Sequence, residues 1–155
     1  MSNTLFNTEL AIIQAPMAGV QNAQLAVAVC EAGGLGSLPC AMLSKEQLIN
    51  ELDYLTHHTN KPYNLNFFCH QVSPYSEAEQ QQWHELLSPY FAEFEIDASQ
   101  FSRKASRQPV DQQVIDTIAT YKPPVVSFHF GLPNQEIIAQ IKAWGGKVLS
   151  SATTL

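Results

Sequence analysis

The 155-residue chain has few cysteines, few basic residues and no long hydrophobic run. Its three cysteines (Cys30, Cys40 and Cys69) contain no CxxC pair, so we expect reduced thiols in a cytoplasmic protein and no zinc site. Eight basic residues against 14 acidic ones give a net charge of −6, which argues against a nucleic-acid partner. No apolar run approaches the roughly 18 residues of a membrane span, and residues 1–10 have no features of a secretory signal. We therefore expect no membrane partner.

Glycine is also scarce where a dinucleotide-binding turn would need it. No GxGxxG motif follows the first predicted strand, and the cluster Gly33-Gly34-x-Gly36 precedes a strand, which argues against such a turn. The neighbouring pair His57-His58 falls near the end of a predicted helix. A solvated helix face is the expected interpretation of this pair, and a metal-binding pair is the alternative.

Short apolar runs alternate with helical patterns along the chain. Strands are predicted at residues 10–15, 35–38, 63–68, 125–130 and 147–150. Alternation of this kind predicts parallel strands joined by right-handed crossovers. Two α/β architectures fit: an open doubly wound sheet, or an eight-stranded barrel cut short.

Capping signals predict where the intervening helices begin. Asn22 is a good N-cap, and Ser44 with Gln47 and Ser76 with Glu79 have the spacing of a capping box. The helix after Ser76 is predicted to have an apolar face formed by Trp83, Leu86, Leu87 and Tyr90. Residues 93–109 are predicted to be irregular. Their basic side chains, Arg103, Lys104 and Arg107, are expected to be solvated, with a phosphate contact as the alternative.

Four segments, taken in order, resemble the nitronate monooxygenase family: IIQAPMAGV, AVAVCEAGGLGSLPCAMLSKEQL, KPYNLNFF and VVSFHFGLP. The resemblance runs from about Ile12 to Thr154. It implies a TIM barrel of the (β/α)8 type that binds FMN and has an added helical segment. The family's AGGH-type motif, which carries the catalytic histidine, and its glycine-rich phosphate loops do not occur in this chain. The resemblance thus implies that residues 1–155 are the N-terminal part of one barrel domain, truncated to about its first five parallel strands.

The resemblance implies a flavin-dependent monooxygenase, an oxidoreductase whose role is detoxification. In the family, an alkyl nitronate and dioxygen are converted by oxidative denitrification to a carbonyl compound and nitrite, with FMN as the cofactor and no metal. An FMN-dependent enoyl-acyl-carrier-protein reductase or an NADH:quinone reductase is the alternative within flavin barrels. A non-catalytic half-barrel that serves as an assembly module is the alternative of another class.

In a barrel of this kind, functional residues follow the carboxyl ends of the strands. By the resemblance, the backbone of Ala15, Pro16 and Met17 lies against the flavin ring, and Asn66 contacts FMN through its amide. Core filling is the alternative for Met17, and an amide bonding its own backbone is the alternative for Asn66.

Two further residues are candidates beyond the flavin contacts: His129 as a catalytic residue and Tyr90 as a substrate-binding residue. His129 stands at the end of an apolar strand, either as a buried core histidine or as an imidazole near the flavin or an anionic substrate. It is not the family's catalytic histidine, which belongs to the AGGH-type motif. Tyr90 matches, by the resemblance, a tyrosine that lines the substrate region.

An incomplete barrel would expose two sheet edges and part of its interior. We therefore expect this chain to be marginally stable alone or to associate with another chain through these edges. It supplies one wall of the flavin site but no phosphate anchor. We expect weak or absent FMN binding and negligible turnover by this chain alone.

Overall fold

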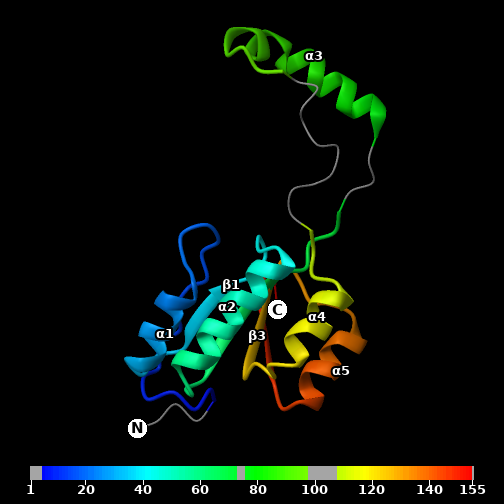
Figure 1. Cartoon of the computed structure of the whole chain (residues 1–155). Coiled ribbons are helices and arrows are strands. Elements are labelled where there is room, and N and C mark those ends of the chain that lie inside the picture. The colour runs from blue at the N-terminus through cyan, green and yellow to red at the C-terminus, as the bar shows by residue number, and fades with distance from the viewer. Residues whose placement is uncertain (1–4, 73–75, 98–107, 155) are drawn as a thin grey trace. The chain divides into compact units, whose positions relative to one another are not determined.

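The computed structural model describes residues 5–72, 76–97 and 108–154. The chain divides into two units, one formed by residues 1–70 with 107–155 and the other by residues 71–106 (Figure 1). In chain order the first unit contains α1 (Ala23–Glu31), β1 (Gly36–Pro39), α2 (Lys45–His58), β2 (Tyr63–Phe68), α4 (Gln112–Ala119), β3 (Val125–His129), α5 (Gln135–Ala143) and β4 (Lys147–Ser150). The second unit contains α3 (Glu77–Glu93).

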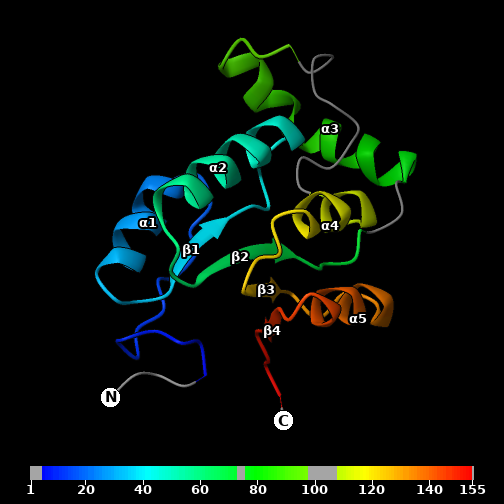
Figure 2. The ribbon, with the colours of Figure 1, turned by 60° about the horizontal axis from the view of Figure 1, so that its bottom comes forward.

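The strands form one parallel sheet in the order β1-β2-β3-β4. Each strand pairs with the next in the chain, and a helical connection separates them (Figures 1 and 2). Register aligns Pro39 with Asn66 and Asn66 with Ser127, so the carboxyl ends of β1, β2 and β3 meet at one edge. The predicted α/β alternation and parallel pairing are confirmed.

The prediction of a buried strand at residues 10–15 is wrong. This segment makes an isolated parallel bridge between Ile13 and Leu35, supported by hydrogen bonds from Leu35 N to Ile12 O and from Gln14 N to Leu35 O. The side chains of Ile12 and Ile13 are 58% and 47% exposed. The segment follows β1 in the parallel direction, but no described element packs over these isoleucines.

The predicted N-caps form as side-chain hydrogen bonds. Asn22 and Ser76 accept from the N–H groups of Leu25 and Glu79, and Ser44 forms a reciprocal capping box with Gln47. At Ser76 the predicted capping box is present only as this cap, without the return bond from the Glu79 side chain. A new helix therefore begins soon after each of these polar residues, because the side-chain oxygen satisfies a backbone donor that has no partner within the helix.

One face of the sheet is covered by α1, α2, α4 and α5 (Figure 2). Buried apolar side chains from these helices pack against alternate strand residues, among them Leu38, Leu65, Phe67, Val126 and Phe128. The residues between them point to the opposite face, because successive strand residues alternate. That opposite face carries Ser37, Asn64, Asn66 and Ser127, all buried polar residues.

The second unit is described by itself. None of the residues of α3 is buried, and Trp83, Leu86 and Tyr90 are more than half exposed. The predicted helix and its apolar residues are present, and no other described element of this unit covers that apolar face. Arg103, Lys104 and Arg107 lie outside the described residues.

Candidate functional site

A pocket of about 370 Å³ lies along the polar face of the sheet, toward the carboxyl ends of β2, β3 and β4. It is lined by Ile13, Pro16, Asn64, Asn66, Phe68, Ser127, Phe128, His129, Leu149, Ser150 and Ser151. This lining joins amides, hydroxyls, apolar groups and one imidazole, and contains no lysine, arginine, aspartate or glutamate. Its chemistry suits a flat, largely uncharged heterocycle better than a metal ion or a phosphate.

Asn66 has a fixed orientation in this pocket. The side chain is 8% exposed, and its Nδ2 donates to Ser127 Oγ at 2.9 Å and to Ser127 O at 3.4 Å. The amide therefore bonds the neighbouring strand and not its own backbone, so the turn-amide alternative is wrong. With the donor held by Ser127, the carbonyl oxygen of Asn66 remains as an acceptor.

Two buried amide atoms beside this pocket have no hydrogen-bond partner among the described residues: Asn64 Oδ1 and Gln14 Nε2. Both amides are tied to Ser37, since Asn64 Nδ2 donates to Ser37 Oγ at 3.0 Å and Gln14 Oε1 accepts from Ser37 N at 3.0 Å. Sequence reasoning did not select Gln14 or Asn64. The signal for Asn64 is the alternation Asn-Leu-Asn in β2, which places two amides on one face.

His129 ends β3 and is exposed, so the core-histidine alternative is wrong. Its Nδ1 lies 2.8 Å from Ser151 Oγ, and its ring lies 3.8 Å from the Phe130 ring, measured between centroids. Phe130 has a φ of +69°, an uncommon conformation for a side-chain-bearing residue. Phe68 completes this aromatic cluster, with its ring 5.3 Å from that of Phe130.

The loop that follows residues 10–15 reaches the pocket only in part. Pro16 lines it, whereas Met17 is 53% exposed and does not. Met17 is thus not a core residue, and the core-filling alternative is wrong. Ala15 is exposed, and its carbonyl oxygen accepts a hydrogen bond from Gln21 Nε2 at 2.8 Å.

Tyr90 belongs to the second unit, on α3, and is 56% exposed. Its assignment to the substrate region stays a prediction. A hollow of about 200 Å³ along the same helix is lined by Gln80, Trp83, His84, Leu87 and Phe91.

The histidine pair at the end of α2 bonds the helix backbone. His57 Nδ1 lies 2.6 Å from Asp53 O, and His58 Nδ1 lies 2.7 Å from Tyr54 O. Within the described part of the chain, no group of three or more His, Cys, Asp or Glu side chains could hold a metal ion. The solvated-face interpretation fits these contacts.

The three cysteines are free thiols. Burial raises the pKa of Cys40 well above its usual range, and it raises the pKa of Cys69 to about 11. Both thiols therefore stay protonated near neutral pH, and neither has the lowered pKa of a nucleophilic cysteine.

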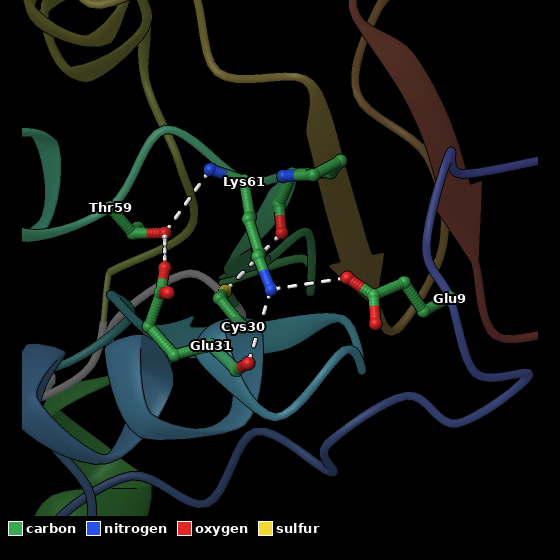
Figure 3. A network of polar contacts seen from close by, with 6 residues as sticks. Glu9, Cys30, Glu31, Thr59 and Lys61 are labelled. Carbon is green, nitrogen blue, oxygen red and sulfur yellow. Dashed lines mark hydrogen bonds and ion pairs between the residues drawn. The ribbon is translucent and has the colours of Figure 1, made fainter.

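Charged side chains lie at the amino end of β2, where the loop of residues 59–62 leads into the strand. This end of β2 is opposite to the pocket. Figure 3 shows Lys61 between Glu9 and Glu31: its Nζ lies 3.2 Å from Glu9 Oε1 and 3.1 Å from Glu31 O. Thr59 Oγ1 donates to Glu31 Oε1 at 2.6 Å. In parallel α/β barrels this end serves stability, whereas chemistry gathers at the carboxyl ends.

No helix in the described ranges 5–72, 76–97 and 108–154 is long and apolar enough to cross a membrane.

Comparison with known proteins gives a consistent result. The family model for nitronate monooxygenase matches residues 1–155. The chain is 39% identical over 155 residues to a nitronate monooxygenase of Paraburkholderia phytofirmans, covering 97% of this chain and 42% of the relative. It is 36% identical over 154 residues to a nitronate monooxygenase of Pseudomonas aeruginosa, covering 97% of this chain and 43% of the relative. The chain thus spans less than half the length of these relatives.

Solved structures agree. A nitroalkane oxidase from Streptomyces ansochromogenes superposes with a TM-score of 0.77 and 33% identity, covering 95% of this chain and 41% of that one. FabK from Thermotoga maritima superposes with a TM-score of 0.62 and 25% identity, covering 94% of this chain and 35% of that one. These neighbours are TIM barrels, so the predicted fold class is confirmed, with four strands and one isolated bridge where about five strands are predicted.

Proposed function

Because this chain belongs to the nitronate monooxygenase family, we propose that its polar sheet face forms one wall of an FMN site. The complete enzyme would convert alkyl nitronates and dioxygen to carbonyl compounds and nitrite. The observation that carries this proposal is the pocket itself. Pro16, Asn66 and His129, which are far apart in the sequence, line one pocket near the carboxyl ends of parallel strands.

The pocket fits the ring of FMN but not its phosphate. A flavin pyrimidine edge presents both donors and acceptors, and the acceptor of Asn66 suits a ring N–H. The lining of the pocket has no cation for a phosphate. We therefore assign only the ring to this wall and expect the phosphate anchor to lie in a part of the family domain outside this chain.

The chain's own residues have separate roles in this proposal. FMN, when bound, supplies the redox chemistry between nitronate and dioxygen. Ser127 holds the Asn66 amide in one orientation, and Pro16 and Phe68 exclude water from the apolar part of the pocket. The imidazole of His129, held by Ser151, lies at the pocket as a hydrogen-bonding group for an anionic nitronate.

We also propose that residues 1–155 belong to one FMN-dependent barrel domain, with α3 in an added helical segment, and that the protein acts in the cytoplasm. The exposed isoleucines of residues 12 and 13, at one edge of the sheet, support association with further strands. Sedimentation equilibrium of the isolated chain tests whether it self-associates. A stable monomer at micromolar to millimolar concentration would contradict self-association of the chain.

The function is tested with a chimera that joins residues 1–155 to the remaining segment of the Paraburkholderia relative. We expect a yellow protein that consumes an alkyl nitronate with dioxygen and releases nitrite. A chimera that binds FMN but oxidises NADH without acting on the nitronate would contradict the proposal and favour a reductase. The isolated chain, titrated with FMN by fluorescence quenching, should show no submicromolar dissociation constant.

A further inference from the structure

Gln21 places both ends of its side-chain amide on the loop that carries Pro16. Its Nε2 donates to Ala15 O at 2.8 Å, and its Oε1 accepts from Met17 N at 3.1 Å. The two partners differ in kind, one an acceptor and the other a donor, so only one orientation of the amide satisfies both. One side chain thus joins the backbone on the two sides of Pro16.

Hydrogen bonds fix the backbone that follows Gln21. The next residue, Asn22, is the N-cap of α1, and Ala23 N donates to Glu51 Oε2 of α2 at 2.6 Å. These contacts tie the start of α1 to a neighbouring helix. Gln21 therefore projects from an anchored point toward a loop that has few contacts of its own.

The loop between Gln14 and Gln21 is held at both ends but has little packing of its own. On its other side, Gln14 is tied to β1 through the N–H of Ser37 at 3.0 Å. Between Gln14 and Gln21 the chain makes a turn in which Val20 N donates to Met17 O at 3.4 Å and Gly19 has a φ of +85°. The side chains of Met17 and Val20 are 53% and 73% exposed, so packing does not fix this turn.

We propose that Gln21 is a positioning residue, which holds Pro16 in place as part of the pocket wall. Because the N–H of Met17 already donates to Gln21, the loop would meet a flavin ring through the packing of Pro16 and not through a hydrogen bond from Met17. The effect on FMN rests on the proposed function. The bracing of the loop does not.

Amide hydrogen exchange of the intact chain, followed by NMR, tests the bracing directly. In Gln21→Leu, which removes both hydrogen bonds, we expect the exchange of Met17 N–H to accelerate about tenfold. Gln21→Glu retains the acceptor for Met17 N–H and loses the donor to Ala15 O, so its effect should be smaller. Gln140→Leu is the matched control, because Gln140 also makes two side-chain hydrogen bonds, to Gln112 and Asp116, on the helical side.

The same variants are then titrated with millimolar FMN. In Gln21→Leu we expect smaller FMN-induced shift changes at the loop, with an unchanged melting temperature. Unchanged exchange at Met17 would overturn the proposal. So would a lower melting temperature with faster exchange at Leu35 and Cys40 as well, which would indicate a purely structural role. If the chimera of residues 1–155 with the remaining Paraburkholderia segment binds no FMN, the proposed function fails, while the exchange data still decide the role of Gln21.

Discussion

The two faces of the sheet differ in chemistry although they alternate along the same strands. On the helix-covered face, Leu65 and Val126 are fully buried among apolar side chains. On the opposite face, Asn66 and Ser127 are nearly as buried but bond each other through polar groups. The first face has every property of a core. The second combines a small apolar cluster around Val125 with amide atoms that have no partner among the described residues and lie beside a pocket.

This difference separates stability from binding within a single sheet. Apolar burial stabilises a fold roughly in proportion to the area removed from water. A buried amide contributes little net stability and costs free energy when it is unpartnered. Substitutions on the two faces should therefore change different measured quantities.

The largest effect on the free energy of unfolding is expected from Leu65→Ala. Leu65 is fully buried against the helices, and truncating such a side chain costs about 2–5 kcal/mol. Ser127→Ala, its counterpart on the polar face, should cost about 1 kcal/mol. Urea unfolding measures both, and equal losses would contradict the division between the faces.

The polar face should show its effect in binding. Asn66→Leu keeps a similar branched shape but removes the acceptor, so the dissociation constant for FMN should rise about tenfold in an NMR titration. Gln140→Leu, on the helical side, should leave that constant unchanged. If both variants bind FMN like the unsubstituted chain, Asn66 does not contact the cofactor.

High pH should weaken the helix-covered face through Cys40. Burial raises the pKa of this thiol, so in the folded state it stays protonated at a pH where the unfolded thiol, with its pKa near 8.5, ionises. Stability is thus fully present below about pH 8.5 and falls as pH rises above it, by up to about 1.4 kcal/mol per pH unit for this group. Urea unfolding between pH 7 and 10 should show a shallower decline in Cys40→Ala. Identical slopes would rule out Cys40 as the cause.

The smallest effect is expected at the end of β2 away from the pocket. The Lys61–Glu9 ion pair is partly exposed, so a double-mutant cycle of Lys61→Met with Glu9→Gln should give a coupling of about 0.2–1 kcal/mol. Added salt should reduce this coupling. A much larger value would mean that charged contacts at this end stabilise the sheet as strongly as the apolar core does.

Much of this fold is predictable from local sequence. Asn22, Ser44 and Ser76 each begin a helix through a short-range hydrogen bond, and apolar runs mark the strands. The error at residues 10–15 has a different origin. An apolar run predicts a buried strand. Whether the strand is buried depends on packing against elements far away in the chain, which the run itself does not reveal. The alternation of predicted strands and helices therefore indicated the parallel direction of this segment, but the apolar run did not indicate its exposure.

The site was less predictable than the fold. Asn66 and Pro16 were selected from strand ends and from the family resemblance, and both line the pocket. That they contact FMN stays a prediction. Gln14, Gln21 and Asn64 were missed, since their roles depend on hydrogen bonds to residues that periodicity does not pair. The predicted role of Tyr90 depends on the placement of α3, which lies in a separate unit.

The most direct test of the account is an NMR titration of the isolated chain with FMN up to millimolar concentration, which detects binding too weak for fluorescence. We expect weak, saturable shift changes at the side-chain amide of Asn66 and at the ring of His129, with none at the outer histidines 57 and 58. Changes confined to the helical side would contradict a flavin site on the polar face.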